Sequence, residues 1–284
     1  MSELSQKVSA LRALLHDLKR VVVCFSGGVD SGYLVAESFA ALGKEALALT
    51  AVSPSLAPEE GAHAQRLAKE IGVRHLLVET HELDDPRYTA NPVNRCYFCK
   101  TETYGAAIEH AHGLGVPHVL DGFNLDDRGD HRPGRQAAVE YGVRSPLDEL
   151  NFTKTDIREA ARHIDLPIWD KPALACLSSR VPYGTEITRF KLEQVNDCEQ
   201  VLHTHGFRVC RVRHHGAMAR IEVLPDEIER LLLPAMREVV VREFRAAGFH
   251  EVTVDLQGYR PGSLNEAVLF KDSTMSIVSL TSGS

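Results

Sequence analysis

The sequence predicts an α/β protein with a doubly wound, mostly parallel sheet and a smaller C-terminal α+β domain. From about residue 20 to residue 170, short apolar runs alternate with helical patterns, which indicates parallel strands joined by crossover helices on both faces of a sheet. After Pro182-Tyr183-Gly184 the order becomes helix, two short strands, helix and strand, which is typical of a small α+β domain with a hairpin. With 284 residues, 44% of them hydrophobic, the chain can bury a core in each of two domains.

The first domain is expected to begin with an amphipathic helix, because Leu4, Val8, Leu11, Leu15 and Leu18 recur at steps of four and three. The expected strands lie at 21–25, 46–52, 75–79 and 118–120, and the expected helices near 31–42, 58–71, 100–112 and 154–164. A capping-box pattern, Thr153 followed by Asp156, opens the last of these helices. Because ligands of such folds bind at the carboxyl ends of the parallel strands, we expect the functional site there.

The second domain is expected to contain a helix at about 188–205, strands at 208–213 and 219–224, a long helix and a last strand at 251–256. We place the first domain at residues 1–183 and the second, with a substrate-binding or oligomerisation role, at 184–267. The weakly patterned tail at 268–284 is expected to be flexible. His214 and His215 are expected in a solvent-facing turn, because neighbouring strand residues point to opposite faces and do not share a metal.

Composition limits the partners of this chain. A formal charge of −7 and balanced charges in the second domain argue against binding a long nucleic acid and favour a small charged substrate. No apolar stretch approaches the roughly 20 residues that span a membrane, so no membrane partner is expected. The N-terminal residues lack a signal-peptide core, and two of the six cysteines form a CxxC pair, so we expect a cytoplasmic protein with reduced thiols. A homo-oligomer is also expected.

Ser26-Gly27-Gly28-Val29-Asp30-Ser31 follows an apolar strand and opens a helix, where backbone N–H groups and glycines can surround an anion. The hydroxyls of Ser26 and Ser31 add donors, and the Asp30 carboxylate is suited to Mg²⁺. No lysine follows the glycines, so the loop is not a Walker motif. The hexapeptide resembles the SGGxDS loop of the PP-loop ATP pyrophosphatases, whose fold is adenine nucleotide alpha hydrolase-like. This resemblance implies that the loop binds the phosphates of ATP, which is split to AMP and pyrophosphate.

Cys96 and Cys99 are three residues apart and can share one metal ion or two irons of a cluster. Cys176 is a third candidate, in a loop-like stretch in which Lys171 and Arg180 favour a thiolate. From the residues alone, a structural zinc with a histidine as fourth ligand, or a redox pair beside an unrelated cysteine, remain alternatives. The other cysteines, Cys24, Cys198 and Cys210, are expected to be buried.

Four further segments carry a closer resemblance: Asp121-Gly122-Phe123-Asn124-Leu125-Asp126-Asp127, Arg132-Pro133-Gly134-Arg135, Ser145-Pro146-Leu147 and Ser178-Ser179-Arg180-Val181-Pro182-Tyr183-Gly184. With the loop, they resemble the LarE-type sulfur transferases of nickel-pincer nucleotide synthesis, over residues 5 to 267. The resemblance implies a pyridinium dicarboxylate mononucleotide as substrate, whose carboxylates are adenylated and then converted to thiocarboxylates. Cys176 matches the family's catalytic, sulfur-donating cysteine, which the single-cysteine version sacrifices. The presence of Cys96 and Cys99 implies the three-cysteine version, with a [4Fe-4S] cluster that carries sulfide.

Arg211 and Arg213 are two residues apart on an expected strand, so they share one face and can fork onto a phosphate or carboxylate. The family resemblance adds Glu199 to this anion site. Arg180 is a loop arginine near Cys176 that could neutralise an acyl-phosphate or face water. A solvated strand face with a salt bridge is the alternative.

The sequence therefore predicts an AMP- and pyrophosphate-forming sulfur transferase with ATP, Mg²⁺ and a [4Fe-4S] cluster as cofactors, and sulfide as a co-substrate. A tRNA thiolase of the PP-loop class, which would bind nucleic acid, is one alternative. An ATP-binding module with a structural zinc is another, and sacrifice of Cys176 is the alternative mechanism.

Overall fold

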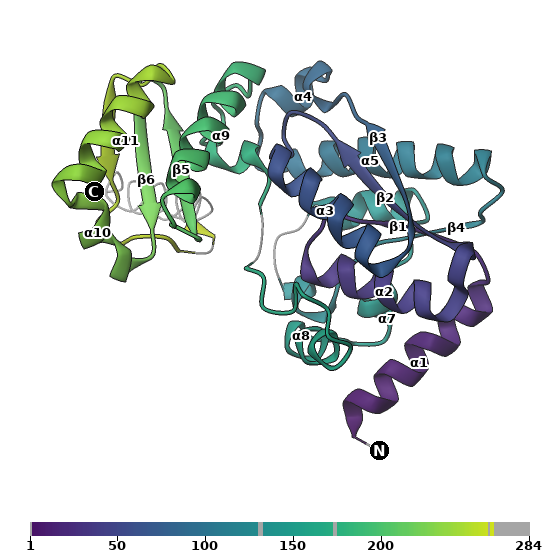
Figure 1. Ribbon diagram of the computed structural model, residues 1–284. Helices are drawn as coiled ribbons and strands as arrows, with labels where there is room; N and C mark the ends of the chain where they lie inside the picture. The colour runs from purple at the N-terminus through teal and green to yellow at the C-terminus, as the bar shows by residue number, and fades with distance from the viewer. Residues whose placement is uncertain (1, 130–132, 173–174, 261, 264–284) are drawn as a thin grey trace, which may run out of the picture. The chain divides into compact units, whose positions relative to one another are not determined.

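The computed structural model describes residues 2–129, 133–172, 175–260 and 262–263 (Figure 1). The chain forms two compact units, which join between Cys176 and Leu177. We call them unit 1 and unit 2. The tail expected to be flexible, residues 268–284, lies outside the described residues.

The central sheet of unit 1 has the strand order β3-β2-β1-β4 and is parallel throughout. Its strands are β1 (Val21–Cys24), β2 (Ala46–Val52), β3 (Arg74–Glu79) and β4 (His118–Leu120), each within one residue of its predicted bounds. β1 is a central strand, with Val21 opposite Ala46 on one side and His118 on the other. The parallel sheet predicted from the sequence is confirmed.

Helices connect and cover these strands: α1 (Glu3–Leu18), α2 (Val29–Leu42), α3 (Pro58–Ile71), α4 (Pro86–Thr89), α5 (Arg95–Gly113), α6 (Gly134–Glu140), α7 (Pro146–Glu149) and α8 (Lys154–His163). Short 3₁₀ turns lie at η1 (Gly43–Glu45), η2 (Glu82–Asp84) and η3 (Leu125–Gly129). The predicted capping box of Thr153 and Asp156 is present at the start of α8. The prediction that a helix begins at residue 100 is wrong, because α5 begins at Arg95 without a side-chain cap from Asn94.

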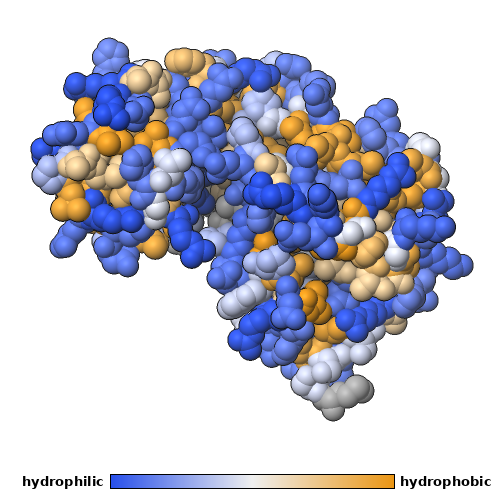
Figure 2. Space-filling view, in the orientation of Figure 1, coloured by the Kyte–Doolittle hydropathy of each residue, from blue (hydrophilic) through white to orange (hydrophobic). Residues whose placement is uncertain are grey.

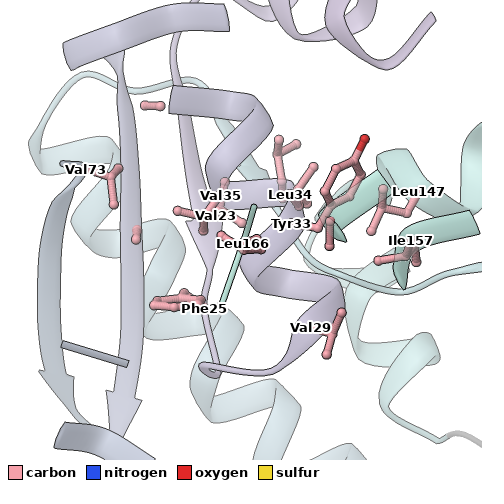
Figure 3. Close-up of a cluster of buried hydrophobic side chains, with 14 of the residues drawn as sticks. Val23, Phe25, Val29, Tyr33, Leu34, Val35, Val73, Leu147, Ile157 and Leu166 are labelled. Carbon is pink, nitrogen blue, oxygen red and sulfur yellow. The ribbon is translucent and has the colours of Figure 1, made fainter. Parts of the chain in front are cut away.

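Side chains of β1 alternate between two cores, as a strand with both faces covered requires. Val21, Val23 and Phe25 join α1, α2, α7 and α8 in one core, which Figure 3 shows around Tyr33, Leu34 and Ile157. Val22 and Cys24 join α5 and α6 in the other core, on the opposite face. Buried residues of α1, including Leu11 and Leu15, cover the first core as their spacing predicted. The doubly wound arrangement is therefore confirmed.

Unit 2 is an α+β domain with the sheet order β5-β6-β7. Its elements are η4 (Leu177–Arg180), α9 (Arg189–Thr204), β5 (Cys210–His215), β6 (Met218–Val223), η5 (Pro225–Glu227), α10 (Ile228–Leu232), α11 (Pro234–Ala246) and β7 (Glu251–Val254). β5 and β6 form the predicted antiparallel hairpin, and β7 runs parallel to β6. Its core includes Phe207, Val212, Ile221 and Phe244.

Two expectations for unit 2 are wrong. The long helix is divided into α10 and α11, because Leu233 before Pro234 has an extended backbone (φ −54°, ψ 140°). His214 is buried rather than solvent-facing: its ring meets Phe249 edge-on at 5.2 Å, and its Nε2 lies 3.1 Å from Gln194 Oε1. His215, the last residue of β5, is exposed as expected.

On the face seen in Figure 2, hydrophobic residues lie in separate patches among hydrophilic ones. Within the described residues, each helix is too short or too polar to cross a bilayer.

Candidate functional site

A cavity of about 460 Å³ lies in unit 1 at the carboxyl ends of β1, β2 and β4. Its lining includes Phe25 after β1, Thr50 in β2 and Asp121 after β4. From the predicted loop it includes Ser26, Gly28, Asp30 and Ser31, and from the predicted cysteines it includes Cys99 and Cys176. This volume is within the range of small-molecule sites, and its position at the strand ends agrees with the sequence prediction.

The loop at residues 26–31 is called the phosphate-binding loop after the role that the sequence predicts for it, and it is held together by its own serines. Ser26 N–H donates to Ser31 Oγ at 3.2 Å, and the two hydroxyl oxygens are 3.1 Å apart. Gly28 is the N-cap of α2, and no side chain caps the first turn of that helix. The uncapped N–H groups and the positive end of the helix dipole therefore suit an anion.

Glycine is required at two places around this loop. Gly27 has a positive φ of +74°, and a Cβ added to it would lie 3.2 Å from the Cβ of Ala64 in α3. A Cβ on Gly122 would lie 2.8 Å from the backbone nitrogen of Ser31. Gly122 lies two residues after the predicted strand at 118–120, and this position at a strand end is the signal in the sequence that it packs near the loop.

Charged groups of both signs surround the cavity. Asp121 is buried and accepts hydrogen bonds from Tyr104 Oη at 2.6 Å and Ser145 Oγ at 2.7 Å, while burial raises the pKa of its carboxyl. Asp30 is half-buried in the first turn of α2. Lys100 lines the same cavity with its ammonium 5.2 Å from the centroid of the Tyr104 ring. Carboxylates for Mg²⁺ and cations for phosphate thus occur together.

Because α5 begins at Arg95, Cys96 and Cys99 both lie in this helix. Side chains three residues apart in a helix are neighbours on one face. Cys99 lines the cavity, as does Cys176, whereas Cys96 is exposed and not part of the lining. Burial raises the pKa of the Cys99 thiol, and the nearby Cys176 and Glu82 raise it further. Among described residues, no three His, Cys, Asp or Glu side chains are positioned to hold one metal ion. Sequence reasoning missed Glu82, which is buried in the short turn η2.

Three predicted anion-site residues form buried ion pairs in unit 2. Arg180 forks onto Glu199, from Nε at 2.9 Å and from Nη2 at 2.8 Å. Arg213 forks onto Glu222 at 2.9 and 2.7 Å and donates to the Ser179 carbonyl. Because all of these side chains are buried, the alternative of a solvated strand face is wrong, although the salt bridge that it included is present.

Arg211 lies in the same group, here called the arginine cluster: Arg180, Glu199, Arg211, Arg213 and Glu222. Its Nη1 donates to the Cys210 carbonyl, and its guanidinium lies 5.1 Å from the Tyr259 ring centroid. Burial and the charge of Arg180 lower the pKa of Arg211. Glu222 also pairs with Arg220 of β6, at 3.1 Å, so two arginines share this one carboxylate. A group of arginines of this kind is suited to an added anion. Glu222 was missed because only the β5–β6 register places it opposite Arg211.

Comparison with known proteins supports one family. No family model matches the chain. It is 46% identical over 265 residues to an uncharacterized protein of Synechocystis, covering 93% of this chain and 99% of that protein. It is 37% identical over 269 residues to the pyridinium-3,5-bisthiocarboxylic acid mononucleotide synthase of Lactiplantibacillus plantarum, covering 94% and 97% respectively. The similarity to that synthase spans nearly the whole of both proteins, and the chain therefore belongs to the LarE-type sulfur transferase family.

Proposed function

We propose that this protein is an ATP-dependent sulfur transferase of nickel-pincer nucleotide synthesis. Its substrate would be a pyridinium dicarboxylate mononucleotide, whose carboxylates become thiocarboxylates. The observation that carries the proposal is one cavity that joins the phosphate-binding loop to Cys99 and Cys176. The synthase of Lactiplantibacillus plantarum, named for a bisthiocarboxylic product, supports the choice of substrate.

In the first step, the loop and the start of α2 hold the ATP phosphates while a substrate carboxylate oxygen attacks the α-phosphorus. The bond to the β-phosphate oxygen breaks, and pyrophosphate leaves with that electron pair. Asp30 would bind Mg²⁺ with the phosphates, and the uncapped N–H groups would bind the departing anion. Catalysis then comes mainly from positioning and charge neutralisation.

In the second step, hydrosulfide sulfur attacks the acyl carbon, AMP leaves with the bonding electrons, and one proton is released. Cys96, Cys99 and Cys176 offer thiolate ligands, the donor type that iron–sulfur clusters require. Cys99 and Cys176 both line the cavity, and Cys96 precedes Cys99 by three residues on α5, which supports the choice of these three ligands. A [4Fe-4S] cluster bound there would supply an open iron position for sulfide. Cys99, with its pKa raised by burial, would have to lose its proton on binding metal.

The arginine cluster in unit 2 would bind the phosphate or a carboxylate of the substrate. Arg211 and Arg213 lie two residues apart on β5, so both guanidiniums share one face of the sheet. Glu199 and Glu222 hold the guanidiniums of Arg180 and Arg213 in fixed orientations, which limits the entropy lost when an anion binds.

Anaerobically purified protein should be incubated with the dicarboxylate mononucleotide, ATP, Mg²⁺ and sulfide, and the products followed by mass spectrometry. We expect AMP, pyrophosphate and thiocarboxylate in equal amounts, with none from Asp30→Asn. Thiolation of tRNA in place of the mononucleotide would contradict the proposal and support a tRNA thiolase. Nucleotide binding without pyrophosphate release, together with bound zinc, would support a binding module.

A further inference from the structure

Lys171 connects the phosphate-binding loop to the start of α3. Its Nζ donates to the Gly27 carbonyl at 3.1 Å and to Glu60 Oε2 at 2.8 Å. The side chain is only 15% exposed, and Lys171 also lines the cavity. An ammonium group is therefore fixed within hydrogen-bonding distance of the loop backbone.

The backbone beside Lys171 is anchored independently of this contact. Arg158 in α8 donates from Nη1 to the Trp169 carbonyl at 2.9 Å and from Nη2 to the Lys171 carbonyl at 2.8 Å. The Lys171 main chain is thus fixed to the scaffold, and its four-carbon side chain can change partners without moving the backbone.

Glu60 can release the ammonium at little cost. Its carboxylate is in the first turn of α3, whose N-cap residue Ala57 makes no side-chain capping bond, so the helix dipole stabilises the negative charge. The Glu60 side chain is 27% exposed, so water can replace the lysine as its partner.

Other cations of the cavity are held differently. Lys154 Nζ lies 3.2 Å from Asp127 Oδ1, and Arg158 is occupied by the two carbonyls. The Lys100 ammonium lies over the Tyr104 ring, on the wall that carries Cys99. Among the described cations that line the cavity, Lys171 is therefore the one that donates a hydrogen bond to the phosphate-binding loop.

We propose that Lys171 is an exchangeable phosphate ligand, held by Glu60 in the empty protein and transferred to the pyrophosphate portion of the nucleotide on binding. This inference rests on the proposed function, since it assumes that the loop binds ATP. Lys171 and Glu60 therefore have opposite effects: the lysine adds to nucleotide affinity, and the glutamate competes with the nucleotide for the ammonium. A salt bridge with a purely structural role would give both residues effects of the same sign.

The test measures binding by calorimetry in the presence of Mg²⁺, with inorganic pyrophosphate, α,β-methylene-ATP and AMP as probes. Lys171→Gln should weaken pyrophosphate and α,β-methylene-ATP by roughly 10- to 100-fold, the loss expected for a hydrogen bond to a charged group, with AMP nearly unchanged. Glu60→Gln should tighten both probes several-fold. Lys171→Arg should recover part of the lost affinity.

Lys7 provides a matched control. Its ion pair with Asp156 has the same 2.8 Å separation and similar side-chain exposures, 17% and 22%, but joins α1 to α8. Lys7→Gln should leave all three affinities unchanged. Equal affinity in wild type and Lys171→Gln, or weaker binding in Glu60→Gln, would overturn the inference alone. Wild-type protein that binds neither pyrophosphate nor the ATP analogue would overturn the proposed function as well.

Discussion

Arg180 and Glu199 form a bidentate ion pair in the interior of unit 2, and the same Glu199 Oε1 accepts the Val212 amide at 2.9 Å. One carboxylate thereby joins η4, α9 and β5.

Glu199→Gln should lower the local free energy of unfolding of β5 by about 3 kcal/mol, because loss of one partner leaves a buried guanidinium uncompensated. Hydrogen exchange at the Val212 amide measures this effect. Glu243→Gln is the control, since its pair with Arg242 is exposed and should contribute less than about 1 kcal/mol. Equal effects of the two substitutions would contradict the importance of burial.

Arg211→Gln should weaken binding of the dicarboxylate mononucleotide by about 1.5 to 3 kcal/mol, the range for hydrogen bonds to charged groups. Binding of α,β-methylene-ATP should be unaffected. Arg213→Ala is a poorer test, because it also leaves the buried Glu222 without its main partner. Arg242→Gln is the control, since Arg242 is an exposed arginine of α11 that pairs with Glu243. Unchanged substrate affinity in Arg211→Gln would remove the arginine cluster from the binding site.

Gly27→Ala should abolish pyrophosphate release, because its positive φ is unfavourable for alanine and the new methyl group would press on Ala64. Gly142→Ala introduces the same backbone strain at φ +66°, with no atom within 4 Å of the added Cβ. The backbone strain should cost each variant about 1 kcal/mol of stability, and Gly27→Ala should lose somewhat more because of its contact with Ala64. Only Gly27→Ala should lose activity, and full activity in that variant would show that the loop does not bind phosphate.

Replacement of Cys96, Cys99 or Cys176 by alanine should each remove the iron–sulfur absorbance of anaerobically purified protein, because two thiolates rarely retain a cluster. Cys198→Ala is the control, since Cys198 is buried in the core of unit 2. Mass spectrometry after turnover distinguishes the sacrificial mechanism. Loss of the elements of H₂S at Cys176, with iron-free protein fully active for one round, would contradict the cluster mechanism.

Stability should fall as the pH is lowered from about 6.5, because burial lowers the pKa of His63, His75 and His214 in the folded protein. Below that pH the unfolded chain binds more protons than the folded protein, so the free energy of unfolding decreases. His75→Gln should make this dependence shallower between about pH 5 and 6.5. Equal slopes in wild type and His75→Gln, measured by urea unfolding, would contradict the assignment.

Thr50 explains why glutamine suits position 75. Its hydroxyl donates to the Phe25 carbonyl at 2.6 Å, so in the 2.8 Å contact with His75 the ring Nε2 is the donor. A glutamine amide keeps a donor there without a titrating group.

Local pattern was sufficient for the sheet of unit 1 and for the loop, because apolar runs, glycines and helix starts are properties of short segments. It failed at the start of α5, since Asn94 makes no side-chain cap that would identify the boundary. It also could not place Glu60 beside Lys171, 111 residues apart in the chain, or Glu222 opposite Arg211. Those contacts depend on how elements pack and on strand register, which no short window of sequence contains.

The position of the CxxC pair on α5 has a consequence for how the protein matures. This helix has 19 residues, and Tyr104, Ala107 and Ala111 anchor it in the core against β1 and β4. Small zinc domains fold only when metal arrives, because their ligands have no other support. Here the helix that carries two of the proposed cluster ligands is supported by packing. If the protein binds the cluster, the polypeptide would therefore fold first and receive iron afterwards, and depletion of iron would yield an intact, refillable apoprotein rather than an unfolded chain.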